Sequence, residues 1–304
     1  MKTSMPKTST MPVHEWIITR LIQVSGYLSI FFVGLISVFL ITEGSPALAE
    51  APFSSLFGER WYPIEGYYSI WPLLSGSLII TVSAVLVALP LGIGTAVYIS
   101  EIAPPWIKEI LKPLVELLAG LPSVVLGFIG ILVLVPFLRQ ALNLPTGLSG
   151  LTGALLLGWI AIPTIVSIAE DALNNVPASY RQAALALGAT RWQTIWGVTV
   201  PAARSGILTA LMLGIGRTLG ETMAVMMVTG NAPVLPTGLD ALFKPLRTMT
   251  ATIASEMGEV AKGSTHYHVL FLIGMALFFF SLAVNAAAFT LSNRRKKRAE
   301  RLLS

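Results

Sequence analysis

The sequence contains no cysteine, which excludes disulfide bonds, thiolate metal sites and cysteine nucleophiles. It is also poor in charge, since Asp, Glu, Lys and Arg make up 12% of its 304 residues. Soluble domains usually carry about 25% charged residues, so this chain cannot cover a soluble surface. Apolar residues instead make up 54% of the sequence. The composition therefore predicts an all-α polytopic membrane protein, with residues 1–304 forming a single domain.

Six apolar runs are long enough to cross a membrane as helices, which takes about 18 residues or more. The predicted spans cover residues 21–42, 71–100, 114–138, 150–169, 203–230 and 267–292. Ala47-Leu48-Ala49, after the first run, looks like a signal-peptidase site. The first run is longer than the roughly 7–15 residues typical of a signal peptide, so an uncleaved anchor is favoured over a cleaved signal.

The positions of the basic residues predict how the spans are oriented. With the N-terminus in the cytoplasm, six spans return the C-terminus there, and fourteen of the twenty Lys and Arg residues then lie inside. Five lie outside, and Arg217 lies within a span. This excess follows the positive-inside rule, so we expect both termini in the cytoplasm. The basic run at 294–298 directly follows a span, which favours contact with anionic membrane lipid over nucleic acid.

The polar stretch between the fourth and fifth spans, residues 170–201, faces the cytoplasm in this orientation. Asn174 and Asn175 are candidate N-cap residues, and residues 178–187 favour a helix. Gly188 suits the position after a helix end, because glycine adopts a positive φ without steric cost. The pattern predicts a short cytoplasmic helix that a glycine turn ends.

Thr190 can cap a second short helix, which we expect Pro201 to end before the fifth span. Two structured helices are more than a connection between spans requires. The stretch therefore indicates a surface that contacts a partner in water. A simple re-entry loop is the alternative.

The spacing in this stretch resembles the EAA motif of ABC-importer permeases. Gln182-Ala183-Ala184 precedes Gly188 by three residues, and Val198-Thr199-Val200-Pro201 follows nine residues later. Gln182 replaces the Glu of the motif, and valines replace its Ile and Leu. The resemblance implies a type I importer permease fold, with a coupling helix that docks on an ATPase subunit. If the motif Glu contacts that subunit, we expect Arg181 or Arg191 to replace it.

A second resemblance covers residues 71–293. The run from Gly216 to Asn231 is similar to the fifth span of the C-type permease of high-affinity phosphate (Pst) importers, and Gly120-Leu121-Pro122-Ser123 also fits that pattern. It implies import of inorganic phosphate by alternating access across the bacterial plasma (inner) membrane. It further implies a second, A-type permease, two ATPase subunits that bind ATP and Mg²⁺, and a periplasmic phosphate-binding protein. No cofactor is expected in this chain.

Arg217 and Glu221 are the candidate residues of the transport pathway. Arg217 lies 13 residues beyond Arg204, which is roughly 20 Å along a helix. A charge at that depth usually marks a pore or a paired site. Arginine suits phosphate because its planar fork donates two parallel hydrogen bonds to an oxyanion. Glu221 is four residues further on, so we expect it to share a helix face with Arg217 and to hold it when no anion is present. A structural ion pair is the alternative.

Enzyme functions find no support in the sequence. It contains no G-x-x-x-x-G-K-[ST] loop for ATP, no H-E-x-x-H and no G-x-S-x-G. His266 and His268 lack a third ligand nearby, so we expect no metal site. We expect Glu256 and Glu259 on a solvated face of the outer loop. The alternative functions are import of another oxyanion such as sulfate or molybdate, a stand-alone secondary transporter or channel, and an intramembrane enzyme that uses Glu221.

Overall fold

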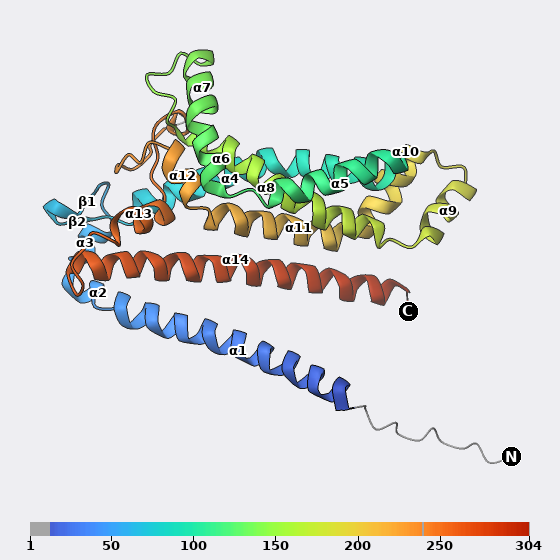
Figure 1. Ribbon diagram of the computed structural model, residues 1–304, viewed down its shortest axis with the longest axis horizontal. Coiled ribbons are helices and arrows are strands. Elements are labelled where there is room, and N and C mark those ends of the chain that lie inside the picture. The colour runs from blue at the N-terminus through green and yellow to red at the C-terminus, as the bar shows by residue number, and fades with distance from the viewer. Residues whose placement is uncertain (1–12, 239, 304) are drawn as a thin grey trace.

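Most of the chain forms helices that run along one axis, as the apolar runs predict (Figure 1). The computed structural model describes residues 13–238 and 240–303. The long helices are α1 (Val13–Gly44), α4 (Trp71–Val97), α5 (Pro105–Ala119), α8 (Gly150–Asn174), α11 (Val200–Gly220) and α14 (Thr265–Leu303). The shorter ones are α2 (Ala47–Glu50), α3 (Phe53–Leu56), α6 (Ser123–Ile129), α7 (Val135–Ala141), α9 (Ala178–Ala186), α10 (Arg191–Thr194), α12 (Met223–Val228) and α13 (Met249–Glu256).

The remaining elements are short. Strands β1 (Trp61–Tyr62) and β2 (Tyr67–Tyr68) form an antiparallel hairpin around the 3₁₀ turn η1 (Pro63–Glu65). A second 3₁₀ turn is η5 (Ala241–Phe243), and three π-helical segments are η2 (Tyr98–Ile102), η3 (Gly130–Leu134) and η4 (Ile195–Thr199).

Within the described residues, six helical stretches are long and apolar enough to cross a membrane, which confirms the predicted number of spans. They are Glu15–Glu50, Trp71–Ile102, Ser123–Ala141, Gly150–Asn174, Arg191–Gly220 and Thr265–Ala287. The side chains of the basic run at 294–298 lie outside the part of the chain that the structure describes.

The prediction of one continuous third span at 114–138 is wrong. The chain forms α5, breaks at Gly120–Pro122, and continues as α6 in a different direction toward α7 (Figure 1). Pro122 causes the break, because proline has no backbone N–H to donate and disfavours a helical backbone at the preceding residue, Leu121. The candidate span therefore begins at Ser123, and α5 precedes it as a separate helix.

Each π-helical segment ends two residues before a proline. Segment η2 precedes Pro104, η3 precedes Pro136, and η4 precedes Pro201. A proline ring clashes with the carbonyl four residues earlier, and the wider π turn gives that ring more room. At Pro201 the result is a helix that stays continuous from α10 through η4 into α11. The prediction that Pro201 ends the second short helix is therefore wrong.

The centre of the bundle is the contact of α4, α8 and α11. Ile165 of α8 is fully buried between two glycines, Gly92 of α4 and Gly214 of α11. A Cβ atom at Gly92 or Gly214 would lie 2.8 Å from Ile165, so glycine is what lets the three helices approach. Helix α1, by contrast, packs mainly on α14 and stays exposed on most of its surface.

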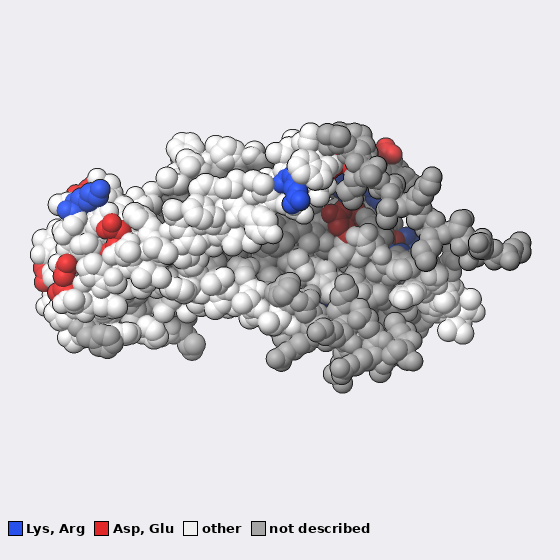
Figure 2. Space-filling model, turned by 90° about the horizontal axis from the view of Figure 1, so that it is seen from below, with Lys and Arg blue, Asp and Glu red and all other residues white. Residues whose placement is uncertain are grey.

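Polar and charged side chains gather toward the two ends of the long axis. We call the end with residues 98–112 and 170–199 the coupling end, and the end with residues 59–69 and 231–264 the hairpin end. Figure 2 shows charged side chains at the left end of the face seen from below, a basic group near mid-length and further charged groups toward the right end, with uncharged residues between the left end and mid-length. Helix α1 begins and α14 ends toward the coupling end (Figure 1).

Candidate functional site

Helix α9 at the coupling end is the short helix predicted from the polar stretch. It begins after Pro177, whereas Asn174 and Asn175 end α8, so the prediction that these two residues cap α9 is wrong. Gly188 has φ +85°, as predicted for the residue that follows a helix end. Its N–H donates to the carbonyl of Leu185 at 3.0 Å, and the N–H of Ala189 donates to the carbonyl of Ala184 at 3.1 Å. This pair of bonds is a Schellman motif, which fixes where α9 stops.

Thr190 caps α10, as predicted, and the cap is a capping box with Gln193. Its hydroxyl accepts from the N–H of Gln193 at 3.3 Å, and the side chain of Gln193 accepts from the N–H of Thr190 at 2.8 Å. Two backbone donors are therefore satisfied at the start of the helix that leads into the fifth span.

The predicted coupling residues lie around this turn. Gln182 and Ala183 are exposed on α9, Ala184 is buried beneath it, and Gly188 and Pro201 are exposed. The adjoining surface is apolar, with Leu185, Leu187, Trp192 and Trp196 exposed, Leu187 to 90%. An exposed apolar rim around a short helix suits contact with a partner protein.

Arg181 does not take the place of the missing Glu on this surface. Its side chain turns into the protein, where Nη2 lies 2.6 Å from Oε1 of Glu101 and Nε lies 3.1 Å from the same oxygen. Nη2 also donates to the carbonyl of Leu173 at 2.8 Å, and Nη1 to that of Val176 at 2.7 Å. Arg191 is used internally too, since it donates to the backbone carbonyl of Glu101. The expectation that either arginine replaces the motif Glu is not supported.

Glu101 is a residue that sequence reasoning missed. It follows α4 in the segment η2, and only the folded chain brings it to Arg181, which lies 80 residues later. No local pattern marks it, because a Glu in a short charged loop is normally exposed to solvent. In the structure the side chain is only 11% exposed.

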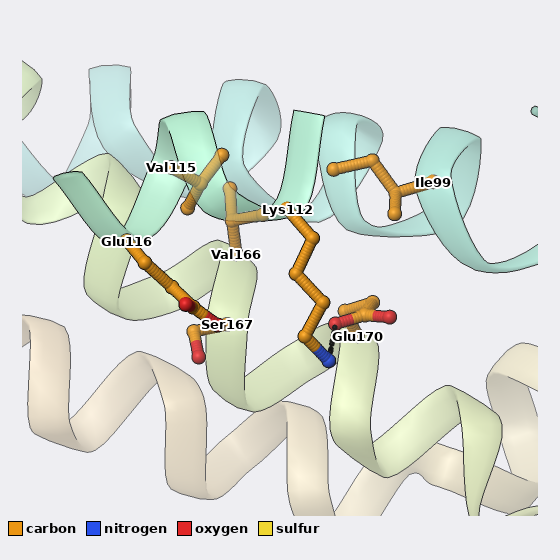
Figure 3. Close-up of a pocket in the computed structure, with 7 residues that line it drawn as sticks. All are labelled: Ile99, Lys112, Val115, Glu116, Val166, Ser167 and Glu170. Carbon is orange, nitrogen blue, oxygen red and sulfur yellow. Dashed lines mark ion pairs between the residues drawn. The ribbon is translucent and has the colours of Figure 1, made fainter. Parts of the chain in front are cut away.

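A second polar cluster joins α5 to α8 beside this pair (Figure 3). The ammonium of Lys112 points at Glu170 and lies 3.0 Å from Oε2, while the other oxygen accepts from the Nδ2 of Asn174 at 2.7 Å. The hydrogen bond to Glu170 raises the pKa of Lys112, which lies outside the six candidate spans, above its ordinary value of 10.5. Asn174 in turn accepts from the hydroxyl of Ser100 at 2.8 Å. These contacts connect η2, α5 and α8 close to α9.

Arg217 lies in the last turn of α11, next to the end of α5. Its Nη2 is 3.4 Å from the carbonyl oxygen of Ala119, the last residue of α5. The Nε atom is buried and has no hydrogen-bond partner in the described structure. The C-terminus of α5 attracts the positive charge of Arg217, but this single contact leaves most of the five guanidinium N–H donors unused.

Glu221 does not share a helix face with Arg217, so that part of the prediction is wrong. Helix α11 ends at Gly220, and Glu221 has extended backbone with ψ 127°. Its carbonyl accepts from the hydroxyl of Thr250 at 3.1 Å, and its carboxylate lies 3.5 Å from the N–H of Ala224. Among the described ion pairs, none joins Arg217 to Glu221. Glu221 instead lines a small cavity whose other polar walls are hydroxyl side chains, those of Ser77, Thr81, Thr218, Thr248 and Thr250.

Glu256 at the hairpin end was expected on a solvated face, and this prediction is wrong: its side chain is only 18% exposed. Its carboxylate accepts from Nε1 of Trp61 at 3.1 Å, pairs with Arg247, and lies 2.8 Å from Nε2 of His266. His268 binds the carbonyl of Glu43 at 2.8 Å through Nδ1. The described residues contain no group of three or more His, Cys, Asp or Glu side chains placed to hold a metal ion.

Comparisons with known proteins agree with this arrangement. The family described as "Binding-protein-dependent transport system inner membrane component" matches residues 88–297. A Bacillus subtilis protein named "Probable ABC transporter permease protein YqgH" is 41% identical over 266 residues, 86% of this chain and 85% of that protein. "Phosphate transport system permease protein PstC" of Mesorhizobium japonicum is 33% identical over 285 residues, 88% of this chain and 86% of that protein.

Solved structures resemble the fold at low sequence identity. A chain of a bacterial alginate ABC transporter, in complex with an alginate-bound periplasmic protein, has a TM-score of 0.63 at 16% identity, covering 93% of this chain and 96% of that chain. A chain of the MetNI methionine ABC transporter has a TM-score of 0.54 at 18% identity, covering 74% of this chain and 93% of that chain. Identities this low show a shared fold and carry no information on substrate.

Proposed function

The chain belongs to the family of binding-protein-dependent transport system inner membrane components, and from that premise we propose that it is the permease through which an ABC importer moves inorganic phosphate into the cell. Its six membrane helices form the type I importer permease fold, and it is a multi-pass protein of the bacterial inner membrane. Relatives named as phosphate permeases, at 33% identity over most of the chain, support phosphate as the substrate.

The observation that carries the proposal is the state of Arg217. Its Nε atom is buried without a partner, its Nη2 makes one long contact at 3.4 Å, and the described structure places no carboxylate within 4.0 Å. Arg217 is partly buried, and a cation with a buried, unpaired donor is costly inside a membrane bundle unless an anion or water reaches it. An arginine in that state suits a permeating phosphate, which can accept two parallel hydrogen bonds.

The exposed surface of α9 at the coupling end supports a partner ATPase. Helix α9 presents Gln182 and Ala183 beside exposed apolar residues, and the sequence contains no G-x-x-x-x-G-K-[ST] loop for ATP. We therefore assign ATP and Mg²⁺ binding to two partner ATPase subunits, one of which docks on α9. A second, A-type permease completes the pathway, and a phosphate-binding protein delivers the anion to the hairpin end. In this assignment both termini and the coupling end face the cytoplasm, in line with the positive-inside rule.

The experiment combines purification with transport. The chain is purified in mild detergent together with the subunits that bind it in its native cells, and the complex is reconstituted in liposomes with the candidate binding protein. We expect a second permease and an ATPase to co-purify, and uptake of phosphate, but not sulfate or molybdate, to require ATP. Uptake of another oxyanion in preference to phosphate would overturn the substrate, and uptake by this chain alone without ATP would indicate a secondary transporter or channel.

Arg217→Lys tests the site directly. Lysine keeps the charge and loses the planar fork, so we expect phosphate uptake to fall by roughly tenfold, the effect of one charge-assisted hydrogen bond. Arg204→Lys is the matched control, because Arg204 is exposed in the same helix. Unchanged uptake in Arg217→Lys would show that bidentate recognition of the anion at this position is wrong.

A further inference from the structure

The orientation of helix α9 depends mainly on side-chain contacts, because the helix is short. It has nine residues, and isolated helices shorter than roughly 12–15 residues are marginal in water. Its two ends are a Pro177 connection to α8 and the glycine turn at Gly188. A partner that pushes on α9 can therefore tilt it locally unless something ties α9 firmly to the spans.

The tie is made by Arg181, whose guanidinium contacts three residues, Glu101, Leu173 and Val176. Nε and Nη2 bind the carboxylate of Glu101, while Nη2 and Nη1 also bind the carbonyls of Leu173 and Val176. Leu173 is in the last turn of α8, and its carbonyl also accepts from the N–H of Val176 at 3.2 Å. One guanidinium thus joins α9 to the end of α8 and to the segment that follows α4.

Glu101 binds the helices on both sides of the glycine turn, α9 and α10. Its carboxylate binds Arg181 on α9, and its backbone carbonyl accepts from Arg191 at the start of α10. The side chains of Arg181 and Glu101 are 24% and 11% exposed, so water screens the pair only in part. The bidentate, planar geometry resists rotation in a way that a single ammonium contact does not.

We propose that Glu101 and Arg181 are positioning residues of the transport cycle, which hold α9 rigidly to α4 and α8 so that displacement of α9 moves these spans. The inference rests on the proposed function, because it takes a partner ATPase as the source of the displacement. The pair touches neither the anion nor ATP, and acts only by keeping the docking helix and the spans in one rigid unit.

The first test measures coupling in the reconstituted complex. In Glu101→Gln and in Arg181→Lys, we expect ATP hydrolysis to continue while phosphate imported per ATP falls by roughly fivefold or more. The controls are Glu109→Gln, an exposed carboxylate on α5, and Arg204→Lys, an exposed arginine on α11. Wild-type coupling in both pair variants would overturn the proposal, as would parallel loss of ATP hydrolysis and transport in a normally assembled complex.

The second test does not need transport. Because the chain has no cysteine, Leu187→Cys and Trp159→Cys give two unique positions for spin labels, one beyond α9 and one on α8. Both native side chains are exposed, to 90% and 62%. We expect a narrow distance distribution in the otherwise native protein and a clearly broader one after Glu101→Gln. Equal widths would overturn the proposal.

The two tests separate the inference from the proposed function. If the native complex imports no phosphate, the proposed function fails while the label distances still report on the pair. If the native complex imports phosphate and the pair variants match it in coupling and in distance width, the inference alone fails. Arg181→Lys keeps the positive charge and so gives the label test a second variant, should Glu101→Gln not accumulate in the membrane.

Discussion

The hydroxyl of Ser77 accepts a hydrogen bond of 3.0 Å from the backbone N–H of Met249, and this bond joins α4 to the start of α13. Both residues are buried, Met249 completely. The start of α13, which follows the fifth span in the chain, is thus fixed inside the bundle by this bond. The neighbouring Thr250 donates to the carbonyl of Glu221, so the same segment also fixes the break after α11.

Ser77→Ala should destabilise the protein by about 1–3 kcal/mol, because it leaves the buried N–H of Met249 without an acceptor. Thermal unfolding of the purified protein in detergent measures this loss. Ser75→Ala is the control, since the Ser75 hydroxyl donates only to carbonyls of its own helix, at 2.8 and 3.0 Å. Equal unfolding temperatures for the two variants would contradict a role for the Ser77–Met249 bond.

Gly76→Ala tests the same contact by steric means. A Cβ atom at Gly76 would lie 2.2 Å from the backbone oxygen of Arg247, so α4 and the chain before α13 would have to separate. We expect a loss of about 1–3 kcal/mol, as for other overpacked sites. Gly94→Ala in the same helix meets nothing within 4 Å and should be neutral or stabilising. If both variants unfold alike, the close approach of Arg247 to α4 is wrong.

Glu256→Gln should weaken the hairpin end, because Arg247 loses its negative partner and the contact with His266 changes. A cost of about 1–3 kcal/mol is expected when one member of a largely buried, hydrogen-bonded set is removed. Proteolysis of the 231–264 region should become faster. Glu259→Gln is the control, as Glu259 is exposed in the same loop. Identical proteolysis rates in the two variants would argue against the Glu256 cluster as a stabilising contact.

The spans and the coupling turn were predictable from sequence because their signals are local. Apolar length identifies membrane helices, a glycine after a good helix former marks its end, and Thr190 with Gln193 forms a cap within four residues. Pro201 was misjudged because its effect depends on the π turn before it, which accommodates the ring without ending the helix.

The relation between Arg217 and Glu221 could not be predicted, because it depends on where α11 ends. The sequence around Gly220 holds no proline, and helical spacing placed the two side chains on one face. The contact that stabilises the break comes from Thr250, 29 residues later. Glu101 was missed for the same reason, since its partner Arg181 lies 80 residues away and only the packing of α4, α8 and α9 brings them together.

Gly188→Ala should loosen the coupling turn without touching any neighbour. A Cβ at Gly188 meets nothing within 4 Å, so its whole cost is the φ of +85°, about 1–2 kcal/mol for a residue other than glycine. We expect faster amide hydrogen exchange over residues 178–190 and little change in α4 or α8. Gly197→Ala is the control, because Gly197 is helical with equally open surroundings and no positive φ. Since the Schellman bonds from Gly188 and Ala189 depend on that φ, unchanged exchange in Gly188→Ala would mean that the turn is not what fixes the end of α9.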